Sequence, residues 1–170
     1  MRINIKLFRK LGVLVLILIS GCQGEERNPA SMVFGFESYS SINNVRNIIE
    51  SRKLSWKEIE RSGLSEKDTR PGFEIVRAST QGLSKKLSGK YVFTFFNDQL
   101  MSIWLYPKNK ETANEYLKAQ YRRTPVAGES IHLNSQITLR LGTDIHGSYY
   151  IAWEDEGLVA KHDKWISKYS

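Results

Sequence analysis

Two neighbouring segments rich in aromatic and β-branched residues constrain the fold more than any other part of the chain. Residues 91–96 read YVFTFF and residues 100–106 read LMSIWLY, and Asn97 and Asp98 between them are turn-forming residues. This pattern predicts a β-hairpin. The hairpin bears apolar side chains on both faces, namely Phe96, Met101, Ile103 and Trp104. We therefore expect part of its second face to be covered by another element.

Helical periodicity marks one segment on each side of this hairpin. The first runs from about residue 42 to residue 53, with Ser40 or Ser41 as its N-cap and with apolar residues at helical spacing: Ile42, Val45, Ile48 and Ile49. The second begins after Asn109 and stops before Pro125, and its apolar stripe comprises Ala113, Tyr116, Leu117 and Tyr121. Both are predicted to be amphipathic helices that pack on a sheet.

Shorter patterns supply the remaining elements. Strands are predicted at residues 32–36, 73–77, 136–141, 149–153 and 157–161, with a strand or turn at 54–59. Trp165, Ile166 and Tyr169 predict a short terminal helix. The predicted fold class is α+β, an antiparallel sheet with two main helices packed on one face.

The order of these elements also suggests an internal pseudo-repeat of a helix followed by a meander. Residues 91–100 align with residues 149–158, because each begins with an aromatic strand and continues through an acidic turn to a leucine. Any two hairpins share this pattern, so an unrelated pair of hairpins is the alternative.

The N-terminus is basic and then apolar. Arg2, Lys6, Arg9 and Lys10 precede an uncharged stretch at residues 11–19, which reads LGVLVLILI. A membrane-spanning helix needs about 20 apolar residues, so this stretch is too short to be a permanent anchor. A basic region, a short apolar region and small residues are typical of a cleaved signal peptide.

The end of that stretch, Ile19-Ser20-Gly21-Cys22, resembles the lipobox of bacterial lipoproteins, and Cys22 is the single cysteine. The resemblance implies cleavage between Gly21 and Cys22, a diacylglyceryl group on the Cys22 thiol and an N-acyl chain such as palmitate. In such lipoproteins an Asp after the cysteine favours the inner membrane. Gln23 stands there instead, which implies the periplasmic side of the cell outer membrane, with the inner membrane as the less favoured location.

These patterns divide the chain into a signal peptide at 1–21, a lipidated cysteine with a polar tether at 22–31, and a single α+β domain at 32–170. Removing the signal peptide takes four basic residues and lowers the formal charge from +7 to +3. A mild excess of this size does not indicate nucleic-acid binding.

Few residues point to catalysis or metal binding. His132, His146 and His162 show no ligand spacing, so no metal site is predicted. The acidic run at 154–156 precedes Gly157, and this order is typical of a hairpin turn. The sequence contains no Gly-x-Ser-x-Gly elbow, no Cys–His pair and no phosphate-binding glycine loop.

Two basic pairs and two tryptophans remain as candidate contact residues. Arg122-Arg123 ends a predicted helix, where cations complement the helix dipole. Lys85-Lys86 has no such explanation, and either pair could meet an anionic glycan or phospholipid. Trp56 and Trp104 are candidate anchors for a protein partner if a sheet face exposes them.

We therefore expect a lipid-anchored, non-enzymatic envelope protein that acts as a binding or accessory module, with no cofactor beyond its lipid. The expected partners are the membrane and an envelope protein. An alternative is an inhibitor or immunity protein directed against a toxin or a cell-wall hydrolase, for which tethering would raise the local concentration. An enzyme of unknown type is a third hypothesis, and it would need histidines and carboxylates to converge in a cleft.

Overall fold

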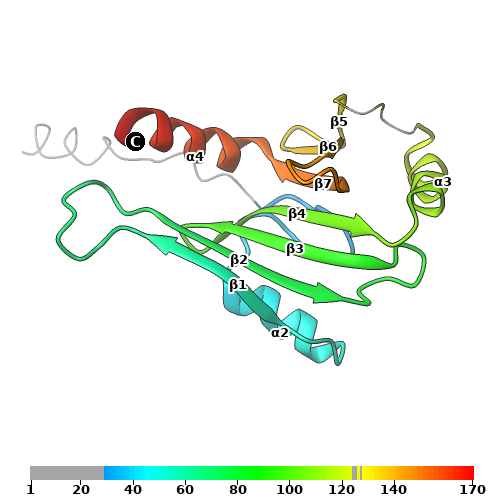
Figure 1. Ribbon diagram of the computed structural model, residues 1–170, viewed down its shortest axis with the longest axis horizontal. Coiled ribbons are helices and arrows are strands. Elements are labelled where there is room, and N and C mark those ends of the chain that lie inside the picture. The colour runs from blue at the N-terminus through cyan, green and yellow to red at the C-terminus, as the bar shows by residue number, and fades with distance from the viewer. Residues whose placement is uncertain (1–28, 124–125, 127) are drawn as a thin grey trace, which may run out of the picture.

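The computed structural model describes residues 29–123, 126 and 128–170 (Figure 1). The helices are α2 (Ile42–Ser51), α3 (Lys110–Tyr121) and α4 (Glu156–Tyr169). The strands are β1 (Lys57–Gly63), β2 (Glu74–Gln81), β3 (Gly89–Phe96), β4 (Gln99–Pro107), β5 (Ser130–His132), β6 (Ile137–Thr143) and β7 (Tyr149–Asp155). They form one sheet in the order β1-β2-β3-β4-β7-β6-β5, and all neighbouring strands are antiparallel. The predicted α+β class is confirmed.

Two meanders make this sheet, and they meet at its centre. Strands β1–β4 follow α2, whereas β5–β7 follow α3 and run inward from the opposite edge until β7 pairs with β4. The order of elements is thus a helix and a meander, twice. The predicted alignment of residues 91–100 with 149–158 is wrong in detail, because it equates Leu100 in strand β4 with Leu158 in helix α4.

One face of the sheet holds the main core and receives α2 and α3, as predicted. Val45 and Ile49 of α2 and Leu117 of α3 are fully buried. They belong to the same cluster as a set of buried strand residues that includes Phe93, Phe95, Ile103, Leu105 and Trp153. The predicted N-caps are also present, since the Ser41 side chain accepts from the Asn44 amide and the Asn109 side chain from the Thr112 amide. Pro125, the predicted stop of α3, lies outside the described residues, and the helix ends at Tyr121.

The opposite face is covered at one end by α4. The sequence predicted a strand and a separate short helix in place of this single helix, and that prediction is wrong. Residues 157–161 are helical rather than a third strand, and α4 continues without a break to Tyr169. Leu158 is fully buried against Phe96 and Met101. In Figure 1, α4 lies above the sheet and α2 lies below it. The expectation that something must cover Phe96 and Met101 is therefore confirmed.

The physical reason for this error lies in the first turn of α4. A short apolar run after acidic residues and beside a glycine fits a strand after a turn and also a buried helix start. Asp155 decides in favour of the helix, because its side chain accepts a hydrogen bond of 2.9 Å from the Leu158 amide. The acidic run 154–156 therefore forms a strand-to-helix junction, and the predicted hairpin turn there is wrong.

The segment before α2 packs on the domain without forming the predicted strand at 32–36. Phe34 and Gly35 have positive φ values of 55° and 78°, and the Phe36 amide donates to the Val33 carbonyl, which makes a turn. Phe36 is fully buried and lies edge-on to Phe93, with ring centroids 5.1 Å apart. Ala30, placed in the predicted tether, is already buried, and its amide donates to the Ser38 hydroxyl.

Candidate functional site

The sheet surface on the α4 side is covered at one end only, and the remaining half forms what we call the open face. Strand register places its side chains on one side: Val92 lies opposite Trp104, Trp104 opposite Ala152, and Ala152 opposite Arg140. The open face comprises Arg77, Val92, Trp104, Tyr106, Arg140 and Tyr150. It combines aromatic rings with guanidinium groups, which are the side chains most often dominant in protein interfaces.

Trp104 and Tyr150 form an aromatic stack at the centre of the open face. Their ring centroids lie 4.3 Å apart, with 22° between the planes. Gly142 makes room for this stack, because a Cβ there would lie 2.6 Å from the Tyr150 hydroxyl oxygen. Both aromatic side chains are partly exposed. The stack is therefore a firm apolar platform with access to solvent.

Beside the stack the open face is hollowed, with a volume of about 460 Å³. Buried Val92 lines the hollow together with Ile59 and Arg77 from β1 and β2. Ile59 falls at a β-bulge, where the register shifts between Glu58 and Glu60, and it is 41% exposed. Bulges redirect side chains at sheet edges, and here the bulge supplies an apolar side chain to the hollow.

A tight turn between β6 and β7 borders the hollow on another side. The Asp144 side chain accepts hydrogen bonds from the Ser148 and His146 amides, each 2.9 Å long. These amide hydrogen bonds, with that of Ser148 the largest influence, lower the pKa of Asp144. Burial, followed by the charge of the nearby Asp144 carboxylate, raises the pKa of Tyr106. Asp144 thus fixes the turn beside Tyr106, which lines the same hollow.

Arg140 on the open face is paired with a buried carboxylate. Its Nη2 lies 2.8 Å from an oxygen of Glu154, whose side chain is 12% exposed. Burial raises the pKa of Glu154, whereas Arg140 and then the neighbouring Trp104 side chain oppose that rise. Loss of Arg140 would leave the Glu154 carboxylate buried without a partner, which is costly. The pair therefore stabilises the sheet surface beside the aromatic stack.

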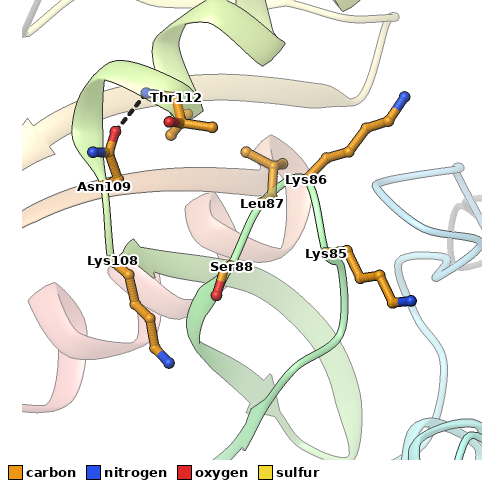
Figure 2. Close-up of a pocket in the computed structure, with 8 residues that line it drawn as sticks. Lys85, Lys86, Leu87, Ser88, Lys108, Asn109 and Thr112 are labelled. Carbon is orange, nitrogen blue, oxygen red and sulfur yellow. Dashed lines mark hydrogen bonds between the residues drawn. The ribbon is translucent and has the colours of Figure 1, made fainter.

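A second, smaller hollow of about 210 Å³ lies where the β2–β3 connection meets the start of α3 (Figure 2). Lys85 and Lys86, singled out from the sequence, line it together with Lys108. Lys108 joins them because its amide donates to the Ser88 carbonyl at 2.9 Å. Nothing in the local sequence marks Lys108 as their neighbour; the signal would have been the hairpin register that pairs Gly89 with Pro107.

The histidines stay apart. His132 contacts Glu156 at 3.1 Å, His162 contacts Asp163 at 2.9 Å, and His146 lies in the turn beside Asp144. Within residues 29–123, 126 and 128–170, no group of three or more His, Cys, Asp or Glu side chains is arranged to hold a metal ion.

Of the acidic run 154–156, Glu154 and Glu156 line one hollow of about 210 Å³ together with Asp163, whereas Asp155 does not. Glu154 pairs with Arg140, Asp155 caps α4, and Glu156 meets the Thr138 hydroxyl. Each carboxylate thus has its own structural partner, and the three do not form a common site.

The structure also locates the remaining candidate contact residues. Trp56 packs on Phe93 and Phe95 and lies under the Arg46 guanidinium, so it belongs to the core side rather than to a binding surface. Arg122 is the C-cap of α3 in a left-handed conformation, and Arg123 pairs with Glu129. Gly21 and Cys22 lie outside the described residues.

Comparison with known proteins gives no match to a family profile and no significant match to a curated protein. In the part of the chain that the structure describes, no helix is both long and apolar enough to cross a bilayer.

Proposed function

We propose that this chain is a lipid-anchored, non-enzymatic protein of the cell envelope that binds a protein partner through its open face. The address comes from the lipobox and its single cysteine. Gln23 directs the protein to the periplasmic side of the outer membrane in this proposal. The lipid on Cys22 is its only covalent group, and two or more acyl chains suffice for stable anchoring.

The observation that supports binding is the uncovered stack of Trp104 on Tyr150 beside a hollow. Apolar and aromatic surface is normally buried when a neighbouring element is available, as α4 buries Phe96 and Met101. On the open face the same sheet presents rings, a β-bulge side chain and arginines to solvent. Lys90 is exposed and also lines the hollow. Such a surface suits a partner that inserts apolar side chains and offers a carboxylate to Lys90.

Site-specific photocrosslinking in cells tests this proposal. A photoreactive residue at His146, whose side chain lines the hollow, should form a discrete adduct with one envelope protein. The matched control is the same residue at Lys118, which is exposed on α3 and remote from the open face. Equal adducts from both positions, or none from His146, would contradict the use of this surface.

The identity of the captured protein separates the two functional alternatives. An envelope component captured in stoichiometric amount supports the accessory-module function. Capture of a toxin or a cell-wall hydrolase, only when cells encounter it, supports an inhibitor that uses the same surface.

A further inference from the structure

Three lysines that project from one end of the domain are the basis of this inference. We call Lys85, Lys86 and Lys108 the lysine patch. All three are exposed, and among the described residues none of them takes part in an ion pair. Five of the described arginines differ in this respect, because each lies against a carboxylate: Arg61, Arg70, Arg77, Arg123 and Arg140.

The backbone holds the two segments of the patch firmly together. Besides the bond from the Lys108 amide to the Ser88 carbonyl, the Tyr91 hydroxyl donates to the Leu87 carbonyl at 2.5 Å. Gly89 permits this close approach, since a Cβ there would lie 2.3 Å from the Tyr106 carbonyl oxygen. Leu87 directly follows Lys85 and Lys86, and its buried side chain fixes their loop on the core. The patch is therefore a fixed feature of the fold.

The direction of the side chains indicates the shape of the partner. Figure 2 shows Lys85 and Lys86 extending to one side of the hollow and Lys108 to the other, so the ammonium groups spread apart. Groups that enclosed one small anion would converge on it instead. Spread cations at a domain end suit a broad surface that bears many negative charges.

We infer that the lysine patch docks the domain on the anionic phospholipid surface to which Cys22 anchors it. This inference rests on the proposed lipid anchor, which keeps that surface within reach. The residues between Cys22 and buried Ala30 span about 30 Å at most when fully extended. Each lysine close to an anionic membrane strengthens binding by about fivefold, so three lysines strengthen docking by roughly a hundredfold.

Docking would also orient the open face. The patch precedes β3, whereas Asn97 and Asp98 follow the opposite end of that strand. With the lysine patch on the lipid, β3 runs away from the membrane, and the stack of Trp104 on Tyr150 lies on the side of the domain. The partner surface then stays accessible while the domain is docked.

Reconstitution of the full lipidated protein tests the inference. Vesicles of phosphatidylcholine alone are compared with vesicles that also contain phosphatidylglycerol, and lysine acetylation is followed by mass spectrometry. We expect Lys85, Lys86 and Lys108 to react severalfold more slowly on the anionic vesicles, with the protection lost at high salt. Lys57 and Lys164, exposed elsewhere, should react equally on both.

A charge-matched pair of triple variants separates the patch from net charge. The readout is energy transfer from tryptophan to dansyl-labelled headgroups, which we expect phosphatidylglycerol to increase. This increase should be lost in the triple variant Lys85→Glu, Lys86→Glu and Lys108→Glu. Lys57→Glu, Lys67→Glu and Lys164→Glu change the charge equally and should retain it. Equal loss in both variants would contradict a specific docking surface.

The outcomes for docking and for anchoring can be told apart. Protein that floats with vesicles but shows equal acetylation on both compositions refutes docking and leaves the anchor intact. Protein that lacks lipid on Cys22 refutes the anchor itself. Protection that occurs in native envelopes but not on phosphatidylglycerol vesicles would assign the patch to an acidic macromolecule and overturn the inference.

Discussion

The ring of Trp104 lies on the ring of Tyr150, with 4.3 Å between their centroids, and the hydroxyl end of Tyr150 lies over Gly142. Three neighbouring strands contribute these residues, because β4 pairs with β7 and β7 with β6. The stack is thus a product of the junction between the two meanders. It also lies beside the Arg140–Glu154 pair, since Trp104 is one of the groups that oppose the rise in the pKa of Glu154.

Gly142→Ala should displace the Tyr150 ring, since the new Cβ would lie 2.6 Å from its hydroxyl oxygen. We expect altered near-ultraviolet circular dichroism and less crosslinking from His146. The free energy of unfolding should change by less than about 1 kcal/mol, because loss of one stack is offset by the lower flexibility of alanine. Gly72→Ala is the control, as its Cβ would meet nothing within 4 Å. Unchanged spectra for Gly142→Ala would mean that the glycine does not position Tyr150.

Leu158→Ala should lower the free energy of unfolding by about 2–5 kcal/mol, because this α4 side chain is fully buried against the sheet. Ile166→Ala in the same helix removes a side chain that is 37% exposed and should cost below about 0.5 kcal/mol. Urea unfolding of both variants measures the difference. Similar costs would show that α4 does not cover the sheet through Leu158.

Glu154 should make stability depend on pH in a defined direction. Because burial raises its pKa in the folded protein, the folded state holds the proton more tightly than the unfolded chain does. Ionisation of Glu154 therefore costs stability as pH rises from its ordinary value of 4.5 through the raised pKa.

The comparison with Glu154→Gln isolates that effect. Relative to this variant, the natural protein should gain stability between about pH 7 and about pH 4, measured by urea unfolding at each pH. Asp68 has the opposite effect on the pH dependence of stability, since Arg70 lowers its pKa to about 2. Because Asp68 is present in both proteins, its contribution cancels in the comparison. A difference that shrinks at low pH would mean that the pKa of Glu154 is lowered instead.

Cys22→Ser should leave the chain as an uncleaved precursor without lipid, because the thiol is the acceptor that the lipobox resemblance requires. Mass spectrometry of the membrane fraction measures both the intact mass and the acyl chains. Ser20→Thr provides a control that keeps the thiol, and it should still be lipidated. Normal processing of Cys22→Ser would refute the proposed anchor.

Several elements were predictable because their signals are local. The 91–106 hairpin, α2 and α3 were predicted from alternation, helical spacing and N-caps such as Ser41 and Asn109, and each is present. Strand β5 was not predicted, since three residues carry too little periodicity. The start of α4 was read as a strand because its buried Leu158 and its cap Asp155 also fit a turn and a strand.

The candidate surfaces were predictable only in part. Trp104 and Lys85-Lys86 were recognisable as single residues of interest, but their neighbours were not. Tyr150 meets Trp104 through the β4–β7 pairing, and the register of β3 with β4 brings Lys108 to the same hollow as Lys86. Such contacts join distant segments, and no local pattern encodes them.

The amino-acid sequence by itself determined that part of the hairpin's second face must be covered and that two amphipathic helices pack on the sheet. The proposed address rests on the sequence alone, through the resemblance to a lipobox at Cys22. Only the tertiary structure decided that α4 covers Phe96 and Met101 while Trp104 stays open. The physical reason is that apolar periodicity specifies which faces need burial, whereas the extent of the covering helix depends on how distant elements pack together.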